Sequence, residues 1–491
     1  MKSRPEDIVF VVSPLLWAQY MYPTGILCLS GYLESRGFPN IILDSKLSIP
    51  HRNIGRARRE NLILEQIREL KPRIVCFSST HMEFDEVTRM NTRVKEIDEK
   101  IISIVGGSQP TYRATDFLDN GFSFTCIGVG EATLFEFVQE IIQETYRWSE
   151  IKGLAWKKNG QNIFNPPRPH DEEAELIDLA MPAYEKLDTR YFEMNSRIVR
   201  GLAIRGAMLL TTRGCPYSCS YCGCNLIFGR KLRYKTLENV EKEVKYLKEN
   251  HGIEGFWLID DTFTVNKAHV EGVSRILKKY GMVWACQSRV DTINEEMIKM
   301  LKDAGCVQID FGVESGSQRI LDEIIGKGIS IDQVINAFRL AKQYNIRTFA
   351  NFMVGLPTET YDDLQKTRDL ADKIDADEYI FSIATPLPGT KLYDMVGEEI
   401  SPHEYSLLNW CGSVLTPKVN RSEIKDLVLE RDNLEKRYAG KSKWRSFLSL
   451  CNPSFFLNRS WKLQRLKIML RFLVGFFLRL IFRDGRKRTR R

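Results

Sequence analysis

Hydrophobic and polar positions alternate along the first 150 residues as short apolar runs separated by longer mixed stretches. The apolar runs predict buried strands, and the mixed stretches have the length and apolar spacing of helices. The predicted strands are 8–13, 40–44, 73–79, 101–107 and 122–128, and the predicted helices are 25–36, 56–70, 83–98 and 130–146. This alternation is typical of a doubly wound α/β domain, a parallel sheet that binds ligands at the carboxyl ends of its strands. Gly106 and Gly107 follow a strand, so they either let a ligand approach the backbone or form an ordinary βα turn.

The pattern breaks between residues 154 and 200 and then resumes. LAWKKNGQNIF predicts a hairpin with an Asn-Gly turn, and the Pro- and acid-rich stretch after it predicts a connector. From Ala207 six strand–helix units predict a partial (β/α)6 barrel of the TIM type, with strands at 207–212, 254–260, 282–288, 307–313, 346–354 and 378–384. We therefore expect a doubly wound domain (1–150), a hairpin and linker (151–202), a partial barrel (203–395), a helical segment (396–450) and a C-terminal tail (451–491).

Polar or special residues follow five successive strands of the predicted barrel. A cysteine cluster follows the first strand, and the later strands are followed by Asp260 and Asp261, Arg289, Glu314, and Gly355. In a barrel of parallel strands these positions converge on one mouth. The sequence therefore predicts one site there, although each charged residue by itself could equally be a solvated loop residue or part of a rim salt bridge.

Composition excludes several classes of protein. Eleven cysteines, mostly scattered, indicate a reducing cytosol with one thiol-rich site rather than a disulfide framework. The N-terminus, MKSRPEDIVFVVSP, carries acids before a short apolar run and does not resemble a signal peptide. The formal net charge is +8, but residues 459–491 contain twelve Lys or Arg and one acid, so the rest of the chain carries a net charge of −3. A folded body without a basic face argues against nucleic-acid binding.

The cysteine cluster lies in TTRGCPYSCSYCGC, where Cys215, Cys219 and Cys222 form C-x3-C-x2-C and Cys224 adds a fourth thiol. A structural zinc site would normally use two separated C-x2-4-C pairs or histidines, and neither is nearby. Three thiolates on one loop suit three corners of a 4Fe–4S cluster whose fourth iron stays open for a ligand. We expect the cluster rather than zinc or an inert loop, and we interpret Cys224 as a spare buried thiol.

CPYSCSYC resembles the C-x3-C-x-aromatic-C signature of the radical S-adenosylmethionine (SAM) superfamily, with Tyr221 in the aromatic position. The resemblance implies a partial barrel, a 4Fe–4S cluster and SAM bound through the open iron. It also implies reductive cleavage of SAM to a 5′-deoxyadenosyl radical that abstracts hydrogen from an unactivated carbon. The electrons would come from a reductase- or flavodoxin-type donor.

The same resemblance assigns roles to the other strand ends. LIDDTF looks like the second-strand motif, which makes Asp260 or Asp261 the candidate partner of the SAM ammonium. Arg289 suits the SAM carboxylate, because a guanidinium pairs bidentately with it. Glu314 is similar to the fourth-strand residue that meets the ribose or amino group. NFMVGLP, with Gly355, and FSIATPLPGT resemble the segments that flank adenine.

The N-terminal domain has a second resemblance. YPTGILCLSGYLESRG, VGGSQPTYRATDFL and IGVGEATLFEF are similar to the amino-terminal domain of cobalamin-binding radical SAM enzymes, which implies cobalamin as a cofactor near Gly106 and Gly107. The D-x-H-x-x-G motif that supplies a cobalt ligand in other cobalamin proteins is absent, and the corresponding stretch is DSKLS. His81 lies near a strand end, but a lone histidine is more often an ordinary loop residue. The cobalt ligand is therefore unassigned.

The tail RSWKLQRLKIMLRFLVGFFLRLIFR, residues 459–483, predicts a helix of roughly 36 Å. Its longest charge-free run, FLVGFFL, is too short to span a bilayer. Lys467, Arg471, Gly475, Arg479 and Arg483 recur every four positions and form a polar stripe beside an apolar face, which is typical of a helix that lies on a membrane surface. The alternative is a helix packed on the barrel with a solvated basic end.

These features together predict a cytoplasmic radical SAM enzyme, peripheral on the inner face of the membrane, that uses cobalamin to C-methylate a small apolar, lipid or isoprenoid substrate. Radical cyclisation or oxidation of a lipid or porphyrin-type substrate is the first alternative. A non-catalytic cluster-binding protein that docks a partner is the second. Trp410 and Cys411, in the segment before the tail, either reach the substrate or pack.

Overall fold

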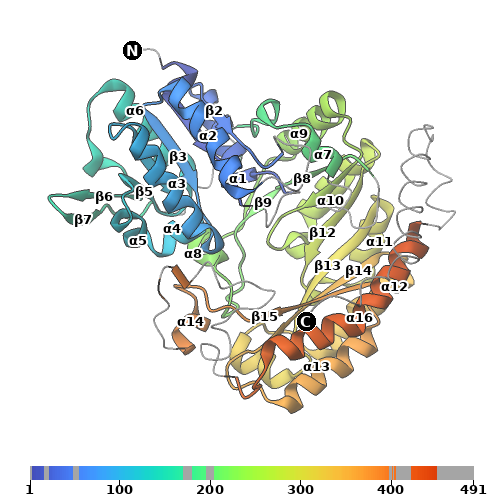
Figure 1. Cartoon of the computed structure of the whole chain (residues 1–491). Helices are drawn as coiled ribbons and strands as arrows, with labels where there is room; N and C mark the ends of the chain where they lie inside the picture. The colour runs from blue at the N-terminus through green and yellow to red at the C-terminus, as the bar shows by residue number, and fades with distance from the viewer. Residues whose placement is uncertain are drawn as a thin grey trace, which may run out of the picture.

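The computed structural model describes residues 3–15, 21–47, 55–169, 178, 180–194, 204–396, 401, 403, 404 and 422–450. Two α/β units lie side by side (Figure 1), one built on a seven-stranded sheet and one on a six-stranded sheet. The fold class predicted from the sequence is confirmed. Trp410, Cys411 and the whole tail from residue 451 lie outside the described residues.

The first unit is a doubly wound sheet of strand order β2-β1-β3-β4-β5-β6-β7. Its elements are β1 (Ile8–Val11), α1 (Thr24–Ser35), β2 (Ile41–Leu43), α2 (Arg56–Leu70), β3 (Ile74–Ser78), η2 (His81–Glu83), α3 (Phe84–Ile97), β4 (Ile102–Gly106), α4 (Ser108–Tyr112), α5 (Ala114–Asp119), β5 (Phe124–Cys126), α6 (Gly130–Gln143), β6 (Leu154–Lys158) and β7 (Gln161–Phe164). The first five strands in the order pair in parallel, and each face of the sheet has its own hydrophobic core. Helices α1 and α6 supply one core, and α2 and α3 supply the other.

The predicted hairpin is present as β6 and β7, but it belongs to the first sheet rather than to a linker. β6 pairs antiparallel with β5, matching Phe124 with Trp156 and Cys126 with Leu154. The first unit therefore extends beyond residue 150, because the edge backbone of β5 finds its hydrogen-bond partners in the hairpin.

The second unit is the predicted partial barrel, a six-stranded parallel sheet of order β15-β14-β13-β12-β11-β8. Its elements are β8 (Gly206–Leu209), β9 (Thr212–Arg213), α8 (Cys224–Phe228), β10 (Arg233–Tyr234), α9 (Leu237–His251), β11 (Gly255–Leu258), α10 (Lys267–Lys279), β12 (Val283–Ser288), α11 (Glu295–Asp303), β13 (Cys306–Glu314), the π-helix η8 (Ile320–Ile325), α12 (Ile331–Gln343), β14 (Arg347–Val354), α13 (Tyr361–Ile374), β15 (Glu378–Ile383), α14 (Lys391–Val396) and α16 (Leu427–Leu450). All six predicted strands are found.

The edge of the barrel at β15 is covered by α16 (Figure 1), part of the segment whose role the sequence left open. Phe381 of β15 donates its backbone N–H to Glu435 Oε1 at 2.8 Å and accepts from Arg431 Nε at 3.0 Å. An edge strand normally leaves such groups unpaired. Side chains of α16 therefore take the place of a seventh strand at this position.

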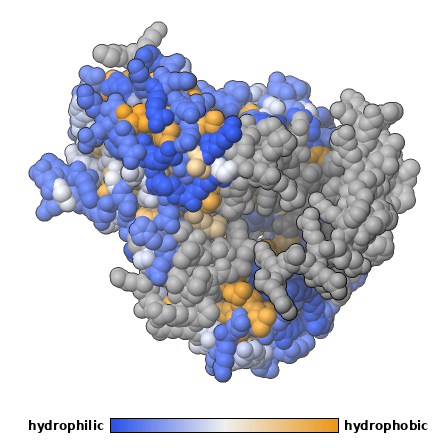
Figure 2. Space-filling view, viewed as in Figure 1, coloured by the Kyte–Doolittle hydropathy of each residue, from blue (hydrophilic) through white to orange (hydrophobic). Residues whose placement is uncertain are grey.

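The surface shown in Figure 2 is mostly hydrophilic where residues are described, with small hydrophobic patches. Isolated apolar residues of this kind are normal on soluble domains. Within the described part of the chain, no helix has the length and apolar character needed to cross a membrane.

Tyr438 is an aromatic anchor in the described part of α16 and gives the first testable prediction. Its side chain is buried, with ring centroids 4.4 Å from Tyr379 and 5.6 Å from Phe381. We expect Tyr438→Ala to lower the free energy of unfolding by about 3 kcal/mol, because it leaves a cavity against β15. Urea unfolding followed by circular dichroism measures this change.

The matched control is Tyr361→Ala, at a tyrosine 49% exposed on α13. Its expected effect is within about 0.5 kcal/mol. Equal effects of the two variants would show that α16 does not stabilise the barrel edge.

Candidate active site

The cysteine loop begins and ends on a short antiparallel ladder. β9 pairs with β10, matching Arg213 with Arg233 and Thr212 with Tyr234, so residues 214–232 form a closed loop. Gly214 has φ +94°, and a Cβ there would lie 2.6 Å from the Lys231 carbonyl oxygen. Only glycine fits this position, because the two arms of the loop approach too closely for a side chain.

Asp260 holds the base of this loop. Its carboxylate is fully buried and accepts the Thr211 N–H at 2.6 Å, the Thr212 N–H at 2.9 Å and the Thr211 hydroxyl at 2.5 Å. Burial raises the pKa of Asp260 to about 6, although these donors oppose the rise. Both oxygens are thus engaged by the end of β8 and the start of β9. This arrangement gives Asp260 a positioning role, and its predicted contact with SAM stays a prediction.

Asp261 also contacts the loop. The Cys224 thiol donates to Asp261 Oδ2 at 3.1 Å, and the carboxylate also accepts from the Gly214 backbone. Cys224 is buried, whereas Cys215, Cys219 and Cys222 are partly exposed. The three signature thiols therefore differ from the fourth in accessibility.

The three partly exposed signature thiols are the predicted ligands of the 4Fe–4S cluster. No group of three or more His, Cys, Asp or Glu side chains among the described residues is arranged to hold one metal ion. A zinc ion needs its thiolates within about 2.3 Å of one point, whereas a four-iron cube holds them at separate corners. The centre of the loop is fixed on two sides, because the Ser220 N–H donates to Ile325 O and the Ser220 carbonyl accepts from Leu392 N, each at 2.8 Å.

Arg289 points one edge of its guanidinium at the thiols. Its Nε and Nη2 donate to the Asp291 carboxylate at 2.9 and 2.8 Å, and Nη2 also donates to Lys327 O at 2.7 Å. The guanidinium carbon lies 3.5 Å from the centroid of the Tyr217 ring. Nη1 faces Cys219 Sγ at 4.0 Å. The structure therefore holds a cation beside the loop, and its predicted contact with the carboxylate of SAM stays a prediction.

Glu314 belongs to a buried ion pair that sequence reasoning did not find. Its Oε1 accepts from Tyr221 Oη at 2.8 Å and from Lys327 Nζ at 2.6 Å. Glu314 has φ +70°, a conformation that non-glycine residues adopt at a cost, and functional sites often contain such strain. A Cβ on Gly312 would lie 2.5 Å from the Glu314 carboxylate, so this glycine makes room for the pair. The one sequence signal for Lys327 is its place between two glycines.

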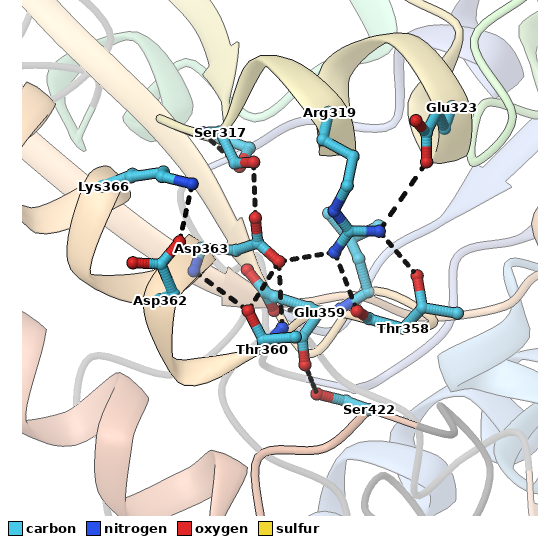
Figure 3. Close-up of polar contacts among 12 residues, drawn as sticks. Ser317, Arg319, Glu323, Thr358, Glu359, Thr360, Asp362, Asp363, Lys366 and Ser422 are labelled. Carbon is cyan, nitrogen blue, oxygen red and sulfur yellow. Dashed lines mark hydrogen bonds and ion pairs between the residues drawn. The ribbon is translucent and has the colours of Figure 1, made fainter.

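The loop after β14, which carries Gly355, is held by a second buried carboxylate (Figure 3). Glu359 Oε2 accepts the backbone N–H groups of Gly355 at 2.5 Å and Leu356 at 3.2 Å. Asp363 lies beside it and accepts from Ser317 Oγ at 2.6 Å and from Arg319 Nη2 at 2.5 Å. These contacts fix the segment predicted to flank adenine.

In the first unit, the predicted cobalamin edge carries buried polar atoms that lack partners. Ser45 Oγ and Gln109 Nε2 are buried and have no hydrogen-bond partner among the described residues. Gly107 has φ +110°, and a Cβ there would lie 2.7 Å from Ser79 O, so the glycines bring two strand ends together. Orphaned buried polar groups of this kind fit a polar ligand such as a cobalamin side chain. His81 lies at the same edge, in η2, and its role stays unassigned.

Glu359 gives a prediction about pH. The side chain is fully buried, its Oε1 has no partner among the described residues, and burial raises its pKa from the ordinary 4.5 to about 7. The contribution of the neutral carboxyl to stability is fully present below about pH 4.5 and is lost as pH rises through about 7. We expect Glu359→Gln to remove this loss, so the stability difference between the variant and the wild type shifts in favour of glutamine from about pH 5 to 8.

Thermal unfolding at several pH values in that range measures the shift. A change in stability that the amide causes equally at every pH does not affect the result. Asp362→Asn, at an exposed carboxylate of the same turn, is the control. A difference between Glu359→Gln and wild type that does not change with pH would contradict the assignment.

Comparison with known proteins agrees with this geometry. The family model of the radical SAM superfamily matches residues 209–371, and the B12 binding domain model matches residues 17–138. An uncharacterized methyltransferase of Pyrococcus horikoshii, PH0819, is 32% identical over 352 residues, which cover 71% of this chain and 74% of the relative. The anaerobic magnesium-protoporphyrin IX monomethyl ester cyclase of Rubrivivax gelatinosus is 26% identical over 419 residues, covering 83% of this chain and 72% of the relative.

Among solved structures, the radical SAM methyltransferase TsrM of Kitasatospora setae shares the fold with a TM-score of 0.68 at 20% identity, covering 79% of this chain and 76% of that one. The two matched models coincide with the two α/β units, and the cysteine loop lies within the second. The chain therefore belongs to the radical SAM superfamily, as an enzyme with a B12-binding domain that uses a 4Fe–4S cluster, SAM and cobalamin.

Proposed function

We propose that this enzyme C-methylates an unactivated carbon of an apolar, lipid or isoprenoid substrate with SAM and cobalamin. One observation carries the proposal: the sheet edge of the B12-binding domain touches the cysteine loop directly, through Tyr112 Oη and Gly223 O at 2.9 Å. In this reaction SAM would activate a substrate carbon and cobalamin would supply the methyl group to it. Both cofactors must therefore face one substrate, because the reacting atoms must come within van der Waals contact. PH0819 and TsrM are both described as methyltransferases, which supports this outcome.

We assign a role in this reaction to each predicted site residue. Cys215, Cys219 and Cys222 would hold the cluster, and Asp260 and Asp261 would keep their loop in place. When bound, the cluster supplies the electron that cleaves SAM reductively, and cobalamin supplies the methyl group. Arg289 would bind the carboxylate of SAM.

The remaining contacts keep SAM in one orientation. Glu314, set by Lys327 and Tyr221, would accept a hydrogen bond from the ribose or amino group. The backbone at Gly355, fixed by Glu359, would lie along adenine. The Arg289 cation, already neutralised on one side by Asp291, keeps an N–H free for an anionic group on the side of the thiols.

Radical cyclisation or oxidation is the second candidate function. The magnesium-protoporphyrin cyclase of Rubrivivax gelatinosus matches over most of both chains, including both α/β units. The two outcomes differ in the fate of the SAM methyl group. In either case the enzyme needs a substrate and a reductant, and we propose a flavodoxin-type donor.

The test is anaerobic reconstitution with iron, sulfide and hydroxocobalamin, followed by dithionite, methyl-labelled SAM and membrane lipid extract. We expect label in a lipid product together with 5′-deoxyadenosine. Deoxyadenosine with an unlabelled, hydrogen-depleted product would assign cyclisation or oxidation instead. No deoxyadenosine from a fully reconstituted protein would contradict both proposals.

Cysteine variants provide the control for that assay. Cys222→Ala should lose most of the bound iron and reduce deoxyadenosine to background, because the cube loses one of three ligands. Cys224→Ala should keep both, because its thiol contacts Asp261 instead. Equal loss in both variants would show that Cys224 is needed for the cluster as well.

We also propose that the tail binds a membrane surface from the cytoplasmic side. The support is its sequence, a basic stripe beside an apolar face, since the tail lies outside the described residues. Each Lys or Arg near an anionic leaflet contributes about 1 kcal/mol, so Lys467→Ser, Arg471→Ser and Arg479→Ser combined should weaken binding by about 100-fold. Co-sedimentation with vesicles of phosphatidylserine and phosphatidylcholine measures this.

A control with the same charge change replaces Lys242, Lys267 and Lys279, which are exposed on the barrel helices. We expect it to bind like the wild type. Equal weakening in both triple variants would mean that overall charge, rather than the tail, attracts the vesicles.

A further inference from the structure

The B12-binding domain contacts the cysteine loop on both sides of its three signature cysteines. Arg213 lies two residues before Cys215, and its Nη2 pairs with Glu131 Oε1 of α6 at 2.6 Å. Gly223 directly follows Cys222, and its carbonyl accepts the Tyr112 hydroxyl of α4 at 2.9 Å. The three signature cysteines therefore lie between two contacts made by the other domain.

Both contacting residues come from the carboxyl edge of the first sheet. Tyr112 ends the short helix that follows Gly106 and Gly107 after β4, and Glu131 is the second residue of α6, which follows β5. This is the edge at which doubly wound sheets bind their ligands. One sheet edge thus both faces the expected cobalamin and reaches the cluster loop.

The contact at Gly223 is tight. A Cβ on Gly223 would lie 2.4 Å from Tyr112 Oη, and the next closest atom would be the ring Cζ at 3.2 Å. The Gly223 carbonyl also accepts the Leu226 N–H at 3.1 Å, the bond that starts α8. Because Gly223 has no side chain, the Tyr112 hydroxyl can reach the Gly223 carbonyl, which also accepts the first hydrogen bond of α8.

The contact at Arg213 is buried. Glu131 is 5% exposed, and the pair borders a cavity of about 20 Å³ lined by α1, α6, β9 and α9, which has room for about one water molecule. An ion pair with little access to water holds its geometry more firmly than a surface pair.

We propose that Tyr112 and Glu131 form a two-point clamp that fixes the cysteine loop to the B12-binding domain and thereby sets the spacing between the cluster and cobalamin. The clamp consists of the contacts Tyr112–Gly223 and Glu131–Arg213. Both residues are positioning residues, since each acts through the loop. The effect on spacing rests on the proposed function, but the clamp itself does not.

Hydrogen exchange on the cofactor-free full chain tests the clamp alone. In Tyr112→Phe the ring stays and one partly buried hydrogen bond is lost, so the amides of Cys222 and Leu226 should exchange about 10-fold faster. Glu131→Gln should have a similar effect at the start of the loop. Tyr146→Phe, at a tyrosine 50% exposed in the same domain, is the matched control and should change nothing there. Unchanged exchange in both clamp variants would overturn the proposal.

A double-mutant cycle makes the test specific to the Tyr112–Gly223 contact. Gly223→Ala should speed exchange strongly in the wild-type background, because the new methyl displaces the phenol oxygen. In Tyr112→Phe, which lacks that oxygen, the same substitution should have a smaller effect. Additive effects would contradict a direct contact.

Spacing is measured on the fully loaded enzyme. The magnetic interaction between cob(II)alamin and the reduced cluster, read by pulsed electron paramagnetic resonance, should give one narrow distance in the wild type and a broader one in Tyr112→Phe. Faster exchange with an unchanged distance would keep the contact and overturn its role in spacing. Faster exchange in a protein that binds no cobalamin would leave the clamp standing and contradict the methyl-transfer proposal.

Discussion

The buried carboxylate of Asp260 fixes where the cysteine loop leaves the barrel. Three donors from the end of β8 and the start of β9 converge on it, and His269 Nε2 lies 2.9 Å from the Thr211 hydroxyl that makes one of those bonds. Removing such a carboxylate would leave several buried donors unsatisfied, each at a cost of about 1–3 kcal/mol. The position of the three thiols therefore depends on a residue that need not touch any cofactor.

The same arrangement, in which one residue holds another in position, recurs around the mouth of the barrel. Groups beside the thiols, such as Arg289 and Glu314, are held by ion pairs with neighbours such as Asp291 and Lys327. Partner atoms on both sides leave each charged group a single orientation, which lowers the reorganisation needed when a charged ligand arrives. The buried Glu359 does the same for backbone N–H groups after β14.

The two α/β units are joined where the chemistry is expected. Besides the contacts at Tyr112 and Glu131, the Tyr22 hydroxyl exchanges hydrogen bonds with the backbone of Met208 at the start of the barrel, at 2.9 and 2.6 Å. Tyr22 packs edge-on against Tyr184, Tyr191 and Phe192. Both sheets thus meet through directional contacts that fix one relative orientation, which two cofactors acting on one substrate require.

The sequence by itself determined the strands, the helices and the cysteine signature, because each depends on residues close together along the chain. Periodicity located all six barrel strands, and spacing identified Cys215, Cys219 and Cys222. It could not decide which sheet the 154–164 hairpin would join, since that depends on the free edge of β5. It also could not place α16 on β15, or show that the Asp260 carboxylate holds the base of the cysteine loop.

Tertiary structure alone brought Lys327 to Glu314 and Tyr112 to Gly223, the latter across 111 positions of sequence. Lys327 belongs to no local motif that would mark it, and the motif that contains Tyr112 indicates the first domain but not a contact with the cysteine loop. The physical reason is that a side chain's partner is set by strand order and by the packing of one sheet edge against another. Those arrangements bring together residues whose separation along the chain carries no signal of their contact.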